Sequence, residues 1–201
     1  MKLVIATSNK NKIAEIKEKF SSVENLEIIP AHELIDIPEI IEDADTFSGN
    51  ALKKAKTIRD LTKLPALADD SGLVIDALNG EPGVLSARYG GKDATDNDRN
   101  MLILKKLLEV PDDERRARFV CSIAIALPDG RDFTVEGTCE GSIAREPSGE
   151  YGFGYDPIFF LPQFNKTMAE ITMREKNQIS HRGKALDGAL EILRVIANEQ
   201  R

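Results

Sequence analysis

Several kinds of feature are scarce or absent in this chain of 201 residues. It has no tryptophan and only two cysteines, Cys121 and Cys139, which are too few for a disulfide-stapled extracellular scaffold. We expect both to be buried thiols rather than a disulfide or a metal pair. The apolar stretch at Met1–Ala6 is too short for a signal peptide, and no run approaches the length of a membrane span. These absences predict a soluble cytoplasmic protein with no membrane partner.

Positive charge is also limited. The chain has 27 Lys and Arg residues against 34 Asp and Glu residues, which gives a formal net charge of −7. Proteins whose main partner is duplex nucleic acid are usually basic, so we expect no nucleic-acid partner. The net charge does not exclude binding of a small phosphorylated ligand, because such a site needs only local positive charge.

Hydrophobic patterning predicts alternating strands and helices. Strands are expected at residues 2–6, 26–30, 117–127, 131–139 and 157–161, and helices at 12–20, 48–61, 96–109 and 183–198. Ser48 is the expected cap of the second helix, and Thr95 begins a near capping box for the third. Pro128-Asp129-Gly130 is typical of a hairpin. We expect one α/β domain over residues 1–201, built around a mixed sheet.

The most informative segment is Ala68-Asp69-Asp70-Ser71-Gly72, which lies between two apolar runs. It predicts a strand, a turn at Gly72 and a second strand. Adjacent carboxylates repel each other and burial disfavours their ionisation, so a positive group should offset them. Mg²⁺ is the simplest candidate, because it binds through one or two carboxylates plus substrate phosphates. A solvated Asp-Ser-Gly turn is the alternative that this segment leaves open.

A second polar segment, Thr7-Ser8-Asn9-Lys10-Asn11-Lys12, lies between an expected strand and an expected helix. Backbone N–H groups at a helix start attract anions, and hydroxyl, amide and ammonium groups crowd the same turn. The segment therefore indicates a phosphate site without the glycines of a P-loop. An ordinary connection capped by Ser8 or Asn9 is the alternative.

An acidic loop with Glu42 precedes the helix that holds Asn50, Lys53 and Lys54. Glu42 is a candidate for a further metal oxygen. Lys53 and Lys54 are adjacent, so at 100° per residue they cannot both face one site. For each of these residues a solvated surface position is the alternative.

Two further segments have residues suited to a purine base. In Phe153-Gly154-Tyr155-Asp156-Pro157, glycine allows close backbone approach, an aromatic face suits stacking, and Asp156 is an acceptor for ring N–H groups. Lys176 and Ser180-His181-Arg182-Gly183 place basic groups just before the last expected helix, where they suit an anion or a keto oxygen. A Gly-rich turn with Phe153 in the core, and a structural His181, are the alternatives.

These segments, together with Pro82-Gly83 and Ser86-Ala87-Arg88-Tyr89, resemble the inosine triphosphate pyrophosphatase family of non-standard purine nucleoside triphosphate pyrophosphatases. The motifs follow one another in the family's order through nearly the whole chain. One departure is Ser8, where many members carry glycine. The replacement of glycine by serine should have little effect if backbone N–H groups bind the phosphate.

The resemblance implies a reaction, a cofactor and a fold. A nucleoside triphosphate such as ITP, dITP or XTP and water give the monophosphate and pyrophosphate, by cleavage between the α and β phosphates. This reaction keeps deaminated purines out of DNA and RNA. The implied cofactor is Mg²⁺, the implied assembly is a homodimer, and the implied fold is an elongated two-lobed α/β structure, a mixed sheet flanked by helices, with the site in a cleft.

The resemblance also implies residue roles. Glu42 and Asp70 ligate Mg²⁺, and Asp70 is the general base, with Asp69 and Lys12 also catalytic. Residues 7–12 and Lys176 hold the triphosphate, while residues 153–156 and His181-Arg182 enclose the base. The full set expected to bind substrate is Thr7, Ser8, Asn9, Lys10, Asn11, Lys12, Lys54, Ser71, Phe153, Gly154, Tyr155, Asp156, Lys176, His181 and Arg182.

The chemistry of the residues agrees with this reading. Phosphoryl transfer needs positioning and charge neutralisation, which cations and a metal supply, and a carboxylate can remove the proton from water. A donor such as Arg182 would pair with the C6 keto group of inosine and clash with the amino group of adenosine. Three alternatives stay open: a pyrophosphatase for other modified nucleotides, a non-catalytic nucleotide sensor, and a structural or interaction module.

Overall fold

The computed structural model describes residues 1–199, which fold into two compact units. Unit 1 consists of Met1–Asp70, Cys121–Gly137 and the chain from His181 onward. Unit 2 consists of Ser71–Val120 and Thr138–Ser180. The expectation of one domain with a central cleft stays a prediction.

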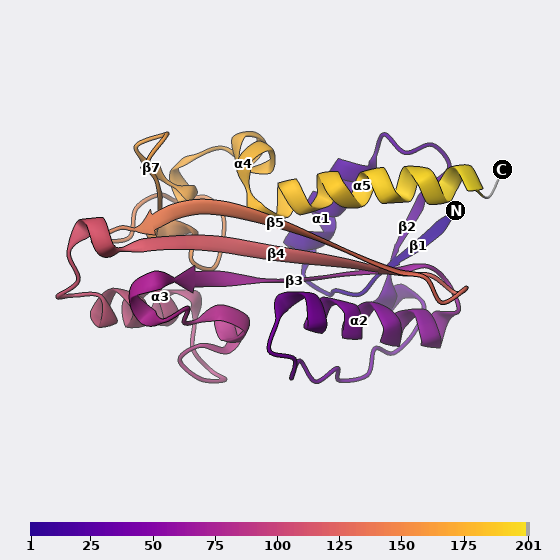
Figure 1. The fold of residues 1–201 in the computed structure, drawn as a ribbon, viewed down its shortest axis with the longest axis horizontal. Coiled ribbons are helices and arrows are strands. Elements are labelled where there is room, and N and C mark those ends of the chain that lie inside the picture. Colours follow the sequence, from indigo (N-terminus) through magenta and orange to yellow (C-terminus); the bar gives the residue numbers. More distant parts are fainter. Residues whose placement is uncertain (200–201) are drawn as a thin grey trace. The chain divides into compact units, whose positions relative to one another are not determined.

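The described strands form one mixed sheet (Figure 1). They are β1 (Lys2–Ile5), β2 (Glu27–Pro30), β3 (Ala66–Ile75), β4 (Arg116–Ala126), β5 (Asp132–Ile143), β6 (Phe159–Leu161) and β7 (Lys166–Thr167). Their order is β2-β1-β3-β4-β5-β6-β7. β1 pairs in parallel with β2 and β3, whereas β6 pairs antiparallel with β5 and β7. The predicted α/β class with a mixed sheet is therefore confirmed.

The helices follow the predicted pattern with several changes at their ends. They are α1 (Lys10–Phe20), α2 (Phe47–Thr62), α3 (Asp96–Lys106), α4 (Met173–Ile179) and α5 (His181–Glu199), and short 3₁₀ segments lie at Ala31–Glu33, Asp76–Leu78, Gly83–Arg88, Asp112–Glu114, Asp156–Ile158 and Met168–Glu170. Thr46, not Ser48, caps α2, because its Oγ1 accepts the Gly49 N–H at 3.0 Å. The predicted box at Thr95 is complete, since the Asp98 carboxylate accepts the Thr95 N–H at 2.9 Å.

The predicted start of the last helix was wrong, and the short helix before it was not predicted. α5 begins at His181, so His181 and Arg182 lie in its first turn rather than ahead of it. Lys176 lies in α4, a helix that the apolar spacing did not reveal because it has only seven residues, MREKNQI, of which two are large and apolar. Thr172 and Glu175 form its capping box. The basic groups are thus fixed by helices and not by a loop.

Helices cover both faces of the sheet in unit 1 (Figure 1). Ile16 of α1 and Leu186 of α5 pack in one cluster with Leu67 of β3. Ala51 of α2 packs in another cluster with Ala68, the next residue of β3. Successive strand side chains point to opposite faces, so β3 contributes alternately to the α1–α5 layer and to the α2 layer.

The prediction of a turn at Gly72 was wrong, because Gly72 lies within β3. The strand runs without interruption from Ala66 to Ile75, and Gly72 is buried within it. The segment is extended because Leu67, Leu73 and Ile75 are all fully buried, and their apolar side chains outweigh the turn preference of Asp-Ser-Gly. Asp69 and Asp70 are therefore consecutive residues of one strand, not the rim of a turn.

Unit 2 has its own core and an unusual buried arginine. Leu73, Ile103, Phe119 and Phe159 belong to one cluster of buried apolar residues, and the Phe119 and Phe159 ring centroids lie 4.4 Å apart. Arg115 is only 2% exposed. Its Nε, Nη1 and Nη2 donate to three backbone carbonyls, those of Ile143 (2.8 Å), Leu107 (2.6 Å) and Ala144 (2.8 Å). Burial first, and then repulsion from Arg145, lowers the pKa of Arg115.

The cysteine prediction is confirmed for the described residues. Cys121 and Cys139 are buried, one in each unit, and neither forms a disulfide. Burial, followed by the negative charge of Asp69, raises the pKa of Cys121 to about 12. Among residues 1–199 no helix combines the length and hydrophobicity needed to cross a bilayer.

Arg115→Ala is expected to lower the free energy of unfolding by about 3 kcal/mol, since three backbone carbonyls, two of them in buried hydrogen bonds, would each lose this donor at roughly 1 kcal/mol. Urea titration at pH 7 measures the change. Arg118→Ala, three residues further along the chain in β4, is the control: the half-exposed Arg118 pairs with Asp76 at the surface, so its loss should cost no more than about 0.5 kcal/mol. Equal losses in the two variants would contradict the structural role of Arg115.

Candidate active site

The Asp69 carboxylate faces the α1–α5 layer of unit 1. Its Oδ2 lies 2.8 Å from Lys12 Nζ and 3.3 Å from Arg182 Nε. The Arg182 Nη1 also donates to Glu15 Oε2 at 2.8 Å. Asp69, Glu15 and Arg182 are all more than nine-tenths buried, so β3, α1 and α5 are joined by an ion-pair network within the core. Lys12 and Glu15 are one helical turn apart and reach the network from the same face of α1.

The Asp70 carboxylate faces the α2 layer. Its Oδ1 accepts from Lys54 Nζ at 3.2 Å, and its Oδ2 accepts from Asn50 Nδ2 at 3.2 Å. Lys54 Nζ also donates to Glu42 Oε1 at 2.6 Å, so Glu42 and Asp70 converge on one ammonium group. Lys53 instead pairs with Asp43 at 2.7 Å. The prediction that Lys53 and Lys54 cannot face the same site is thus confirmed.

Asn50 holds the Glu42 loop next to Asp70. Its side chain is fully buried, its Oδ1 accepts the Ala44 N–H at 3.0 Å, and its Nδ2 reaches Asp70. One amide group thereby ties the loop backbone to the strand. The sequence motif contained Asn50, but no role was predicted for it. Its spacing of four residues from Lys54 was the available signal, because residues i and i+4 share a helix face.

The two carboxylates differ in acidity. Burial opposes ionisation of Asp69, but the charges of Lys12, Arg182 and Lys54 outweigh it and lower the pKa of Asp69. Burial raises the pKa of Asp70, and the negative charge of Glu42 adds to this, while Lys54 and Asn50 oppose it. Asp70 is therefore the better proton acceptor, and Asp69 is a fixed negative charge. The Oδ1 of Asp69 is buried and has no hydrogen-bond partner among the described residues.

The start of α1 differs from the expected cluster of available amides. Asn9 is its cap, and its Oδ1 accepts the N–H groups of Asn11 at 2.9 Å and Lys12 at 3.3 Å. Thr7 Oγ1 accepts the Asn9 N–H at 3.2 Å. The alternative of an Asn9 cap is therefore what the structure has. Ser8, Lys10 and Asn11 are exposed, and the use of residues 7–12 in phosphate binding stays a prediction.

The second group of predicted residues lies in unit 2. Lys176 Nζ bonds to Asp156 Oδ2 at 2.6 Å and lies 4.6 Å from the centre of the Phe153 ring. Asp156 Oδ2 also accepts the Phe153 N–H at 2.9 Å, and both Asp156 and Lys176 are nearly fully buried. Phe153 is half-buried, not an exposed face. Lys176 thus packs over one ring surface of Phe153.

The remaining predicted residues have mixed surroundings. Tyr155 is buried, its OH donates to the Ser86 carbonyl at 2.7 Å, and burial raises its pKa. Ser71 is half-buried within β3, while His181 and Arg182 are buried in α5. The Arg182 guanidinium is engaged by Glu15 and Asp69, and its role in reading the purine stays a prediction.

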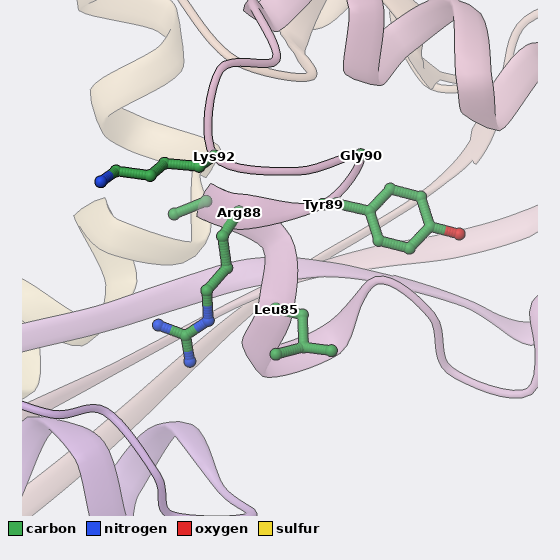
Figure 2. Close-up of a pocket in the computed structure, with 6 residues that line it drawn as sticks. Leu85, Arg88, Tyr89, Gly90 and Lys92 are labelled. Atoms are coloured by element: carbon green, nitrogen blue, oxygen red, sulfur yellow. The ribbon is translucent and has the colours of Figure 1, made fainter.

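A separate cavity of about 580 Å³ lies on the 3₁₀ segment Gly83–Arg88 of unit 2 and on the loop that follows it (Figure 2). Its lining residues are Leu85, Ala87, Arg88, Tyr89, Gly90 and Lys92. In Figure 2 the Tyr89 ring points away from the basic side chains of Arg88 and Lys92. The Tyr89 OH donates to Glu81 at 2.6 Å, and Lys106 of α3 lies 5.1 Å from the centre of the Tyr89 ring. None of the residues predicted for catalysis lines this cavity.

A divalent cation fits the Glu42–Asp70 pair. Both are hard oxygen donors, both lie within bonding distance of the same Lys54 ammonium, and Glu42 raises the pKa of Asp70 by repulsion. Among residues 1–199 no three His, Cys, Asp or Glu side chains are grouped so as to hold a metal. Mg²⁺ does not need such a group, because substrate phosphates and water complete its octahedral shell.

Comparison with known proteins places this chain in a family. The sequence profile of the Ham1 family matches residues 3–192, and the chain therefore belongs to the Ham1 family. A protein of Desulforamulus reducens named dITP/XTP pyrophosphatase is 51% identical over 193 residues, which cover 96% of both chains. The resemblance to the inosine triphosphate pyrophosphatase family is thus confirmed.

Two solved structures share the fold. A HAM1 protein from Coxiella burnetii is 45% identical with a TM-score of 0.90, and the match covers 96% of this chain and 98% of that one. The Ham1 protein of Staphylococcus aureus is 38% identical with a TM-score of 0.88 over 100% of both chains. The strand and helix arrangement described above is that of Ham1 proteins.

Replacement of each aspartate by asparagine should separate their roles in stability. Asp69→Asn is expected to lower the free energy of unfolding by about 3 kcal/mol at pH 7, because Lys12 loses its pairing with this carboxylate and the buried Arg182 loses it too, while keeping its pairing with Glu15. The lowered pKa of Asp69 means that its stabilising contribution is present above its unfolded pKa and is lost as pH falls through the folded value. The raised pKa of Asp70 has the opposite sign, so ionised Asp70 costs stability at pH 7.

Asp70→Asn is therefore expected to leave the free energy of unfolding unchanged or to increase it. Urea titrations of both variants and the unmodified protein, in buffer without divalent cations, measure the contrast. A loss in Asp70→Asn as large as that in Asp69→Asn would contradict the assignment of the two carboxylates to different surroundings.

Proposed function

We propose that this chain is a nucleoside triphosphate pyrophosphatase that converts non-standard purine nucleotides, such as dITP and XTP, to the monophosphate and pyrophosphate. The observation that carries the proposal is the convergence of Glu42 and Asp70 on Lys54, in a chain 51% identical to a relative named dITP/XTP pyrophosphatase. Such an enzyme would keep deaminated purines out of DNA and RNA. The resemblance further implies a cytoplasmic homodimer.

Asp70 is the proposed general base. Its pKa is raised chiefly by burial, which makes it a stronger proton acceptor than an ordinary aspartate. As water attacks, Asp70 takes its proton, the α–β phosphoanhydride bond breaks, and pyrophosphate leaves. Asn50 and Lys54 hold the two carboxylate oxygens in place before this step. Catalysis by positioning is what phosphoryl transfer chiefly requires.

The cations around Asp69 and Asp70 are proposed to neutralise the negative charge of the phosphates. Lys12 and Lys54 are each part of an ion pair in unit 1, and in the proposal they exchange part of that pairing for phosphate oxygens. Glu42 and Asp70 would hold Mg²⁺, which when bound supplies charge to the phosphate oxygens and lowers the pKa of water. Asp69 stays ionised and fixes Lys12 and Arg182.

Recognition of the base is proposed for residues 153–156. Stacking of a purine on the ring of Phe153 would contribute roughly 1–3 kcal/mol. The Lys176 ammonium already lies against that ring, so it reinforces an aromatic platform as well as supplying charge. The expected preference for a C6 keto group requires a hydrogen-bond donor there, and residues 153–156 with His181 and Arg182 are the proposed source.

The activity is tested first by pyrophosphate release from ITP, dITP, XTP, GTP, ATP and dUTP, with and without Mg²⁺. The expected result is Mg²⁺-dependent release that favours ITP, dITP and XTP over ATP. Release that favours dUTP would indicate a pyrophosphatase for other modified nucleotides. Absence of release with retained nucleotide binding would indicate a sensor and contradict the proposed function.

Asp70→Asn is expected to lower kcat with ITP by about 10²–10⁴-fold, the usual contribution of general base catalysis. Nucleotide affinity should change little, as measured by equilibrium titration with IMP. Lys53→Ala is the matched control, because Lys53 lies next to Lys54 but pairs with Asp43 at the surface. Near-normal turnover in Asp70→Asn would refute the base assignment.

A further inference from the structure

Two side chains of α3 hold the Gly154 peptide at both of its polar groups. Asp96 Oδ2 accepts the Gly154 N–H at 2.8 Å, and Asn100 Nδ2 donates to the Gly154 carbonyl at 3.0 Å. Asp96 and Asn100 are four residues apart, so they project from the same face of the helix. We call this arrangement the Gly154 clamp. All of its members belong to unit 2.

The clamp is itself held in place. Arg99 Nη1 donates to Asp96 Oδ1 at 3.0 Å, which leaves Oδ2 directed at Gly154. The capping box of Thr95 and Asp98 fixes the first turn of α3, from which Asp96 projects. The helix start is therefore a rigid support and not a frayed end.

The buried side chain of Asn100 lowers the stability of the fold, which indicates a functional role. It is only 4% exposed, and its Oδ1 is buried with no hydrogen-bond partner among the described residues. A buried polar group that is only partly bonded destabilises a fold, and an apolar residue at this position beside Ile103 and Leu104 would pack at no such cost. The gain from Asn100 is the hydrogen bond to Gly154.

Gly154 needs such support because of its own backbone. Its φ of +63° lies in the left-handed region, and no atom lies within 4 Å of the position that a Cβ would take. Packing on the side that a Cβ would occupy therefore does not restrain this residue. The neighbouring residue Phe153 is fixed at its own N–H by Asp156, so hydrogen bonds hold the backbone both at Phe153 and at the residue after it.

We propose that Asp96 and Asn100 are positioning residues for purine recognition, because they fix the backbone that presents the Phe153 ring. The inference rests on the proposed function, in which that ring stacks on the base. It assigns to α3, which contains none of the residues predicted to bind substrate, control over affinity for the base. The affinity for ligands without a base, such as inorganic pyrophosphate, should not depend on the clamp.

The test compares Asn100→Asp with Asn97→Asp, the same chemical change at an exposed residue of α3. Asn100→Asp keeps the side-chain size but sets an acceptor against the Gly154 carbonyl. Asn100→Asp is expected to raise KM for ITP and the Kd for IMP about tenfold, as for loss of one positioning hydrogen bond. It should leave kcat and the Kd for inorganic pyrophosphate unchanged. Asn97→Asp should change none of these constants.

Asp96→Ala provides a second variant if Asn100→Asp does not fold, since the Asp96 side chain is 55% exposed. It should accelerate hydrogen exchange at the Gly154 amide and weaken IMP binding, again without an effect on pyrophosphate binding. Equal weakening of IMP and pyrophosphate binding, or unchanged IMP binding in an active enzyme, would overturn this inference but not the proposed function. A wild-type protein that neither hydrolyses ITP nor binds IMP would overturn the proposed function and this inference with it.

Discussion

The alternation of side chains along β3 is the constraint on which the site depends. Asp69 and Asp70 are adjacent in sequence, and on a turn their charges would repel at close range. In a continuous strand they point to opposite faces, and each carboxylate meets its own cations: Asp69 meets Lys12 and Arg182, and Asp70 meets Lys54. One strand thereby produces a strongly acidic carboxylate and a more basic one, from the same residue type and one residue apart.

The sequence predicted those features that depend on local pattern. The mixed α/β class, the hairpin after Ala126 and the separation of Lys53 from Lys54 follow from apolar periodicity, turn residues and helix geometry, and all are present. The turn at Gly72 was wrong because local preference for turns yields to burial of the flanking apolar residues. The helix start at His181 was missed because buried charged residues on α5 are stabilised by Glu15 and Asp69, which are distant in sequence.

Positioning residues were harder to predict than residues that carry charge. Asn50 and Asn100 have no acid–base chemistry, and each acts through a single amide that bonds to a segment far away in the chain. Their partners, Asp70 and Gly154, become known only when the fold brings strand, loop and helix together. The same is true of Arg115, whose three carbonyl acceptors come from the ends of α3 and β5. Sequence motifs thus identify reactive groups more readily than the scaffold that orients them.

The placement of one buried cysteine in each unit has a practical consequence for dynamics. With a pKa of about 12, Cys121 exists at pH 7 almost wholly as the thiol, and it is shielded from reagents within the core of unit 1. Cys139 is likewise buried, in unit 2. Alkylation of either thiol therefore requires its own unit to open. The chain carries two native reporters of sub-global unfolding, and their separate labelling rates would reveal whether the units open together or independently.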